Sequence, residues 1–222
     1  MFLCDNLIFR LIYVLISYFL GGIMFCALLP KKLEKIDISA LSDDHNPGAT
    51  NVFLNCGAGL GFVCLILDIL KGFIPVYIAC RMGCSENLFF SLIIIAPVLG
   101  HASGVFNHFH GGKCIATIFG TMLGLLPVSS VVLFLAFLYI LFSVILRIKP
   151  DKKSSIITFT IFGIVGFIVE LLMGRLAISI GCAVISIIAI IKHLMNDELR
   201  SLTLTMTNDE LWSLTLPITN YE

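Results

Sequence analysis

The chain has 222 residues, of which 59% are hydrophobic and only 13% are charged, and its mean hydropathy is +1.05. A typical soluble domain is about half apolar and about a quarter charged, so this composition excludes an ordinary water-soluble domain. Lysine and arginine together number 14, as do aspartate and glutamate. Because the charges balance, they predict neither a nucleic-acid-binding surface nor an acidic tail. We expect one polytopic membrane domain.

Seven apolar segments predict an all-α fold, that of a polytopic integral membrane protein with seven transmembrane helices. A crossing needs about 20 apolar residues, and the fourth segment is the shortest of the seven. Pro127 separates it from the fifth segment, and only Gly174 and Arg175 separate the sixth from the seventh, which predicts a tight hairpin. The predicted spans are residues 7–29, 52–79, 88–102, 115–126, 128–146, 155–173 and 176–191.

The positions of Lys and Arg predict that the N-terminus lies outside and the C-terminus in the cytoplasm, because cytoplasmic loops carry an excess of positive charge. In this orientation the outside loops hold only Arg81 and Arg175, and Arg10 lies near the outer end of the first span. No basic segment precedes the first apolar run, so we expect it to remain as a span. The cytoplasmic loops then hold Lys31, Lys32, Lys35, Lys113, Arg147, Lys149, Lys152, Lys153, Lys192 and Arg200.

Residues 1–195 are expected to form the membrane domain, and residues 196–222 a polar tail. The tail contains a 12-residue near-duplication, NDELRSLTLTMT followed by NDELWSLTLPIT. Alternating Leu and Thr would suit a small β-hairpin, although two strands alone are marginal in water. The alternative is a mobile tail or one that lies at the membrane interface, where Trp212 would suit the headgroup region.

Metal and cofactor sites are not expected. The eight cysteines lie mainly in apolar stretches without the paired spacing of a zinc site, and small apolar residues are the simpler interpretation. His101, His108 and His110 alone are weak evidence for a metal. The glycine run at residues 56–61 does not match a dinucleotide-binding motif, and we interpret it as close helix packing.

Charged residues inside spans are costly, at least about 2.5 kcal/mol each, so they usually line a cavity or have a partner. Asp68 and Lys71 lie three residues apart in the second span, where they share a helix face and can neutralise each other. A functional role and a purely structural ion pair both remain open. Glu170 is expected to reach toward Arg175 or water.

Two polar stretches near the cytoplasmic ends of spans suit a phosphate ligand. The first, NPGATN at residues 46–51, combines a turn with short polar side chains close to a helix start. In the second, Gly111 and Gly112 precede Lys113 and the start of the fourth span. Backbone amides freed by the glycines, a permanent positive charge and the helix dipole would together attract an oxyanion.

These stretches carry a resemblance to a known family. The segments NPGATN (46–51), LDILKGFIPV (67–76), GH (100–101) and FHGGKCIAT (109–117) resemble the bacterial acyl-phosphate-dependent membrane glycerol-3-phosphate acyltransferases, the PlsY family. The resemblance extends over residues 7 to about 196. It implies transfer of an acyl group from acyl phosphate to the sn-1 hydroxyl of glycerol 3-phosphate at the bacterial inner membrane, giving lysophosphatidic acid and phosphate. The implied partners are these substrates and membrane lipid, with no nucleic acid and no cofactor.

Carried over by position, the resemblance implies a set of site residues. The implied catalytic residues are Asn46, His101, Lys113 and His193. The implied substrate- or phosphate-binding residues are Thr50, Asn51, Gly111, Gly112 and Asn196, to which we add Asp68 and Lys71 from the second span. No covalent nucleophile is needed, because acyl phosphate is already activated.

The chain departs from the family pattern at several positions. Asp43, Asp44 and His45 stand where the family carries Gly-Ser-Gly, Leu54 replaces an arginine, and Cys114 replaces a glycine. The missing arginine removes a bidentate phosphate contact. The alternative function is therefore a catalytically impaired relative that binds a phosphate-bearing lipid or a protein partner. A small transporter is a third hypothesis, but no inverted repeat supports it.

Overall fold

The computed structural model describes residues 6–42 and 46–205, with side chains as far as Met195. Within these ranges the chain is all-helical and has no strand, as predicted. Two short elements, the 3₁₀ turn η1 (Cys84–Glu86) and the π-turn η2 (Leu141–Ile145), accompany the α-helices. The α-helices are α2 (Leu7–Gly22), α3 (Phe25–Leu33), α4 (Ile38–Leu41), α5 (Ala49–Arg81), α6 (Phe90–Ser103), α7 (Ile115–Gly124), α8 (Val131–Ile140), α9 (Asp151–Leu172) and α10 (Leu176–Thr205).

Every predicted span coincides with one of these helices or with a broken pair, but seven full spans are not confirmed. Three helices are long and apolar enough to cross a membrane, namely α5, α9 and the Leu176–Met195 part of α10. The pair α2 and α3 would count as a fourth span, although it is bent by 47°. Helices α6 and α7, and α8 with its π-turn, have 10–17 residues and are shorter than a typical crossing.

The bend between α2 and α3 corrects the prediction of one straight span over residues 7–29. After Gly22 the backbone of Ile23 is extended, with φ −69° and ψ 114°. The Ile23 carbonyl therefore has no partner in a continuing helix, and it accepts a hydrogen bond from Lys71 Nζ at 2.6 Å. This buried lysine stabilises the break, because an unsatisfied buried carbonyl would be costly.

Glycines allow two helix pairs to approach closely. A Cβ atom on Gly21 of α2 would collide with the Pro97 backbone of α6, and one on Gly120 of α7 would collide with the Ile69 carbonyl of α5. Small residues at such contacts are typical of membrane helix packing. The interpretation of the glycine run at residues 56–61 as close helix packing holds only in part. A Cβ on Gly61 would lie 2.6 Å from the ring of Phe53, which lies on the other side of the kink at Gly57 (φ 82°), whereas a Cβ on Gly59 would meet nothing within 4 Å.

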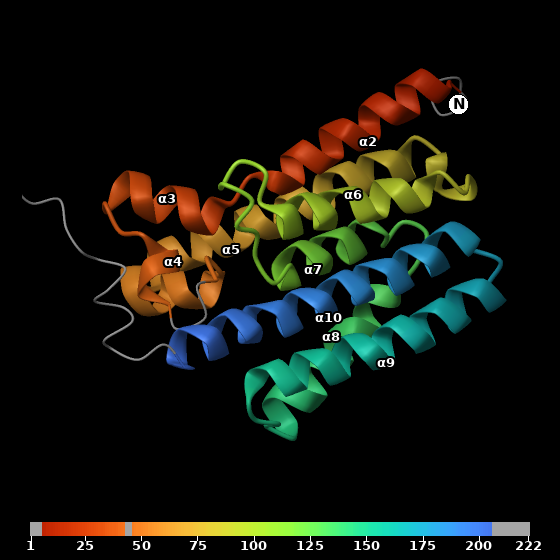
Figure 1. Cartoon of the computed structure of the whole chain (residues 1–222). Coiled ribbons are helices and arrows are strands. Elements are labelled where there is room, and N and C mark those ends of the chain that lie inside the picture. Colours follow the sequence, from red (N-terminus) through yellow and green to blue (C-terminus); the bar gives the residue numbers. More distant parts are fainter. Residues whose placement is uncertain (1–5, 43–45, 206–222) are drawn as a thin grey trace, which may run out of the picture.

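Helices α9 and α10 form the predicted tight hairpin and lie side by side (Figure 1). Gly174 has a φ of 76°, the left-handed conformation that glycine adopts without strain. Just before it, Glu170 is 3% exposed and accepts hydrogen bonds from Ser129 Oγ at 2.6 Å and Arg175 Nη1 at 3.2 Å. The expected pairing with Arg175 is confirmed, but the carboxylate is buried rather than turned to water.

The first copy of the duplicated sequence continues α10 as far as Thr205. This helix corrects the strand interpretation of residues 196–205, because α10 extends across them without a break and helix propagation adds a hydrogen bond for each residue. The second copy, including Trp212, lies outside the described residues. In Figure 1 the N-terminal end of α2 lies at one end of the bundle, and α3, α4, the start of α5 and the end of α10 gather at the other.

Candidate active site

A cavity of about 760 Å³ lies at the end of the bundle where α5, α7 and α9 begin and where α6 ends. Its wall combines polar groups from five helices and their connections with an apolar side. The polar and charged residues of the wall are Asn46, Thr50, Asn51, Asp68, His101, Lys113, Tyr139, Ser143, Lys149, Asp151, Lys152, Ser155 and His193. Seven of the eleven predicted site residues are among them: Asn46, Thr50, Asn51, Asp68, His101, Lys113 and His193.

The turn before α5 is held by hydrogen bonds to the carbonyl of Asn46. This carbonyl accepts the Gly48 amide at 2.8 Å and the Asn51 side-chain amide at 2.7 Å. Asn46 itself is buried, whereas Thr50 is exposed on the first turn of α5. Asn51 therefore fixes the turn, and Asn46 and Thr50 occupy defined positions in the cavity wall.

His101 lies in the last turn of α6 and is 5% exposed. Its Nδ1 atom is buried and has no hydrogen-bond partner among the described residues. A buried polar atom without a partner costs about 1–3 kcal/mol, and such atoms in native structures need an explanation, of which a functional role is one. The position of His101 in the cavity wall favours that explanation.

The two glycines before Lys113 make room for the end of α6. A Cβ on Gly111 would collide with the Ala102 carbonyl, and one on Gly112 would lie 2.5 Å from His101 Nε2 and 3.4 Å from Asn46 Oδ1. The Gly112 amide donates to the His101 carbonyl at 3.2 Å. This amide is engaged within the protein, which corrects our expectation that both glycine amides are available to an anion.

Lys113 is half-buried in the cavity wall, two residues before the start of α7. The next residue, Cys114, has a φ of 67°, the left-handed conformation that glycine adopts most easily. Its thiol donates weak hydrogen bonds to the carbonyls of Gly112 (3.4 Å) and Val98 (3.7 Å). Burial raises the pKa of the Cys114 thiol to about 12, so the side chain is neutral near pH 7.

Asp68 and Lys71 form the predicted ion pair, with Oδ1 and Nζ 2.8 Å apart and both side chains almost fully buried. Asp68 Oδ2 also accepts from the Cys26 thiol at 3.0 Å. Asp68 lines the cavity, but Lys71 is directed to Asp68 and to the Ile23 carbonyl. Lys71 is not among the described residues that line the cavity.

His193 brings α10 to the cavity. Its Nδ1 atom lies 2.8 Å from the Ala189 carbonyl, which can only accept, so Nδ1 carries the proton. Asn196 follows in the same helix, but its side chain lies outside the described residues, as do Asp43, Asp44 and His45. Leu54 is 77% exposed on α5 and is not among the described residues that line the cavity.

One wall of the cavity was not predicted. The Tyr139 hydroxyl lies 3.0 Å from Ser155 Oγ, and Ser143 Oγ lies 2.8 Å from Ser154 Oγ, so hydroxyls link the end of α8 and the π-turn η2 to the start of α9. Lys152 lies beside them on the first turn of α9. The only sequence signal was the presence of these polar residues around the end of an apolar segment.

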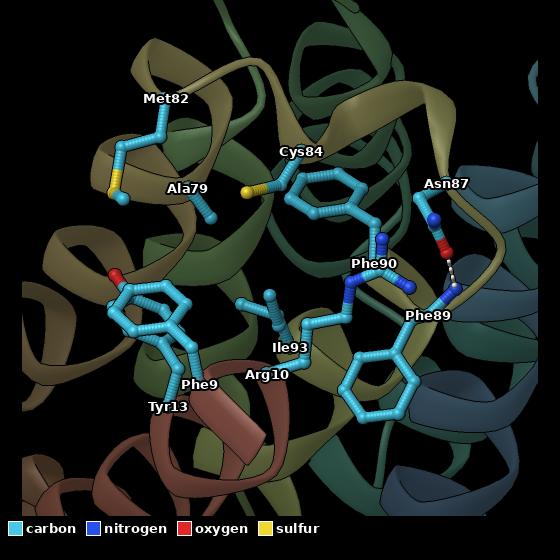
Figure 2. Close-up of a pocket in the computed structure, with 10 residues that line it drawn as sticks. All are labelled: Phe9, Arg10, Tyr13, Ala79, Met82, Cys84, Asn87, Phe89, Phe90 and Ile93. Atoms are coloured by element: carbon cyan, nitrogen blue, oxygen red, sulfur yellow. Dashed lines mark hydrogen bonds between the residues drawn. The ribbon is translucent and has the colours of Figure 1, made fainter. Parts of the chain in front are cut away.

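A second hollow lies at the opposite end of the bundle, between α2, α5 and α6 (Figure 2). The Arg10 guanidinium lies over the Phe89 ring, 5.9 Å from its centroid, and Asn87 accepts the Phe89 amide at 2.9 Å. The volume is about 10 Å³, which is room for about one water molecule. The larger cavity is therefore the candidate active site.

Comparisons with known proteins find relatives of this chain. A family model described as glycerol-3-phosphate acyltransferase matches residues 11–200. The glycerol-3-phosphate acyltransferase of Thermotoga petrophila is 35% identical over 157 residues, which cover 71% of this chain and 77% of the relative. The corresponding protein of Shewanella woodyi is 32% identical over 183 residues, which cover 82% and 86%.

Two solved structures have a similar fold. Both are crystal structures of PlsY (YgiH), described as an integral membrane glycerol 3-phosphate acyltransferase. Its glycerol 3-phosphate form has a TM-score of 0.72 and 29% identity, and the alignment covers 94% of this chain and 99% of PlsY. The lysophosphatidic acid form has a TM-score of 0.70 and 30% identity, with 89% and 94% covered.

Proposed function

Because the chain belongs to the glycerol-3-phosphate acyltransferase family, we propose that it transfers a fatty acyl group from acyl phosphate to the sn-1 hydroxyl of glycerol 3-phosphate. The products are lysophosphatidic acid and inorganic phosphate. The observation that carries the proposal is the cavity of about 760 Å³, which brings Asn46, His101, Lys113 and His193 together from four separate parts of the chain.

The lining of the cavity suits both substrates. Apolar residues from α5 and α7 can accompany an acyl chain, and the polar residues at the same cavity can hold phosphate and hydroxyl groups. A site that must join a lipid-like donor to a water-soluble acceptor needs both kinds of surface. The apolar side of the lining includes Leu65, Ile69, Ile115, Ala116 and Phe119, and the aromatic ring of Tyr139 adjoins the polar residues.

The reaction itself needs positioning more than covalent catalysis. The acceptor oxygen forms a bond to the acyl carbon, the bond from that carbon to the phosphate oxygen breaks, and the proton of the hydroxyl ends on the phosphate product. Acyl phosphate already has a good leaving group, so the protein must hold the two substrates together and stabilise the departing negative charge. A serine, histidine and aspartate triad is not required.

The residues of the wall have distinct proposed roles. Lys113 attracts a substrate phosphate through its permanent charge, and Asn46 and His101 orient the reacting groups. Gly111 and Gly112 let the loop before Lys113 pass close to the end of α6 because they lack side chains that would collide with it. Thr50, Asn51, Asp68, His193 and Asn196 are proposed to complete the binding site, and neither a metal nor a cofactor is involved.

We place the cavity at the cytoplasmic face of a bacterial inner membrane, with the N-terminus outside and the C-terminus inside. The end of the bundle that holds the cavity also holds the basic residues around the end of α3, before α7 and around the start of α9, and the N-terminal end of α2 lies opposite (Figure 1). These basic residues are Lys31, Lys32, Lys35, Lys113, Arg147, Lys149, Lys152 and Lys153. Positive charge is enriched on the cytoplasmic side of membrane proteins. The division into a membrane domain (1–195) and a polar tail (196–222) remains part of this proposal.

A catalytically impaired relative that binds a phosphate-bearing lipid or a protein partner is the second candidate. It is favoured by Leu54, which stands in place of an arginine and is largely exposed outside the cavity wall. Loss of a bidentate guanidinium contact would weaken phosphate binding. An activity measurement separates the two candidates directly.

The test is phosphate release by the detergent-purified protein given acyl phosphate and glycerol 3-phosphate. We expect release that depends on the acceptor and that is lost in Lys113→Ala, while the thermal unfolding profile is unchanged. Omission of the acceptor controls for simple hydrolysis of acyl phosphate. Folded protein that releases no phosphate above this control would contradict the transferase function and support the impaired relative.

A further inference from the structure

The cavity wall contains lysines beyond the one used above. Lys149 and Lys152 line it from the start of α9 and the connection before it, whereas Lys113 lines it from the start of α7. Both substrates of the proposed reaction carry phosphate, so a complete site needs positive charge for two phosphates. If the chain has the proposed function, a second lysine of the wall must bind the phosphate of the second substrate.

The carboxylates of the wall do not oppose a second anion strongly. Asp68 is paired with the buried Lys71, and Asp151 lies 2.9 Å from Lys149 Nζ. The second pair is largely exposed, with side chains 77% and 87% accessible, so water screens it. Among the described residues of the lining, the three lysines (Lys113, Lys149 and Lys152) therefore outnumber the two carboxylates.

Lys152 is the lysine best placed to use this surface. It is half-buried on the first turn of α9, and Ser155, three residues later, lies on the same face of the helix. Ser155 is buried, and its hydroxyl pairs with that of Tyr139 at 3.0 Å. The cavity wall therefore carries the positive charge of Lys152 and the hydroxyl groups of Tyr139, Ser143 and Ser155.

The surroundings of the two lysines distinguish the two substrates. Lys113 is followed by Cys114 and then by the apolar residues Ile115 and Ala116, which continue into the apolar side of the cavity and suit the acyl donor. Around Lys152 the wall is polar, and Ser143 and Lys149 are exposed to solvent. A small water-soluble dianion would enter and bind on this side.

We propose that Lys152, assisted by the hydroxyls of Ser143 and Ser155, binds the phosphate and hydroxyl groups of glycerol 3-phosphate opposite Lys113. In this chain Lys152 would supply the positive charge that is missing because Leu54 stands in place of an arginine. Lys152 is a binding residue for the acceptor and takes no part in breaking the donor's carbon–oxygen bond.

The test compares Lys152→Gln with Lys153→Gln in the full-length protein. Lys153 is the adjacent residue, exposed and outside the described lining, so its substitution removes the same charge from the same helix turn. For Lys152→Gln we expect the KM for glycerol 3-phosphate to rise about tenfold or more, as for loss of one charge-assisted contact. The KM for acyl phosphate and the kcat at saturating acceptor should change little, and Lys152→Arg should retain most of the affinity.

Equal effects of the two glutamine variants, or a rise confined to the KM for acyl phosphate, would overturn the proposal. Direct titration with glycerol 3-phosphate separates this inference from the proposed function. If the wild-type protein releases no phosphate but binds glycerol 3-phosphate, the transferase function fails while the subsite is still tested by its loss in Lys152→Gln. If Lys152→Gln binds glycerol 3-phosphate as tightly as wild type, the subsite is wrong whatever the activity.

Discussion

The carboxylate of Asp68 lies 2.8 Å from the ammonium of Lys71, and neither side chain is more than 3% exposed. The pair connects the cavity to the helix break, because Asp68 lines the cavity and Lys71 holds the carbonyl of Ile23. It therefore fixes the bend between α2 and α3 relative to α5. A structural role for Lys71 and a site role for Asp68 are both consistent with this geometry.

Removal of one partner should destabilise the protein strongly. In Asp68→Ala the charge of Lys71 stays buried without its counter-ion, and breaking a buried pair in this way costs about 3–5 kcal/mol. We expect a clear fall in the thermal unfolding temperature in detergent. The double variant Asp68→Leu/Lys71→Met should recover much of the loss, because it leaves no buried charge.

The exposed pair between Lys149 and Asp151 is the matched control, since its Nζ and Oδ1 atoms are 2.9 Å apart, close to the 2.8 Å of the buried pair. Exposed pairs contribute about 0–1 kcal/mol, so Asp151→Asn should hardly change the unfolding temperature. A similar small change in Asp68→Ala would show that the buried pair does not stabilise the bend.

Gly112→Ala should impair catalysis more than folding. The added Cβ would lie 2.5 Å from His101 Nε2 and would displace the imidazole or the loop before Lys113. A shift of about 1 Å at a reacting centre can cost about a hundredfold in rate. Steady-state phosphate release should therefore fall by about that factor, whereas the unfolding temperature should change only slightly.

Gly59→Ala provides the control for this variant. Its Cβ would meet nothing within 4 Å on the exposed side of α5, and alanine is favoured over glycine in a helix by about 1 kcal/mol. Activity should match wild type, and stability should be equal or higher. Full activity in Gly112→Ala would mean that the approach of the loop to His101 is not needed for the reaction.

Arg175→Ala should lower stability at the end of the bundle remote from the cavity. Of its two described side-chain partners, Glu170 would keep only the Ser129 hydroxyl, and a buried charge without a cation is costly. We expect Glu170→Gln/Arg175→Ala to be more stable than Arg175→Ala alone, because the second change removes the charge. Thermal unfolding of the three proteins measures this coupling, and additive losses would argue against it. The KM values for both substrates should stay unchanged.

Local spacing and motif order predicted much of the molecule. The three-residue spacing of Asp68 and Lys71 was sufficient to predict their contact, because both lie on one helix. The apolar segments predicted the positions of the helices, and the motifs predicted that Asn46, His101 and Lys113 meet in one cavity. These features depend on neighbours in sequence or on a known family pattern.

Features that depend on tertiary contacts could not be predicted in this way. The break after Gly22 is stabilised by Lys71, which donates to the Ile23 carbonyl although it lies 48 residues further along the chain. The kink at Gly57 requires a positive φ, and the glycine run alone does not distinguish a kink from close packing. Likewise, the contact between Tyr139 and Ser155 arises only when α8 folds back on α9.

Cys114 should resist alkylation in the native protein, although it lies in the cavity wall. Its pKa is raised to about 12 by burial, and only the thiolate reacts, so the reactive fraction near pH 7.5 is very small. Because the pKa is raised, the labelling rate should increase as the pH rises toward it, for as long as the protein stays folded. Maleimide labelling followed by peptide mass spectrometry should find Cys114 unmodified in native protein and modified after denaturation. Rapid labelling at pH 7.5 without loss of the folded state would show instead that the thiol is accessible and ionised, and that the turn between Gly112 and α7 opens.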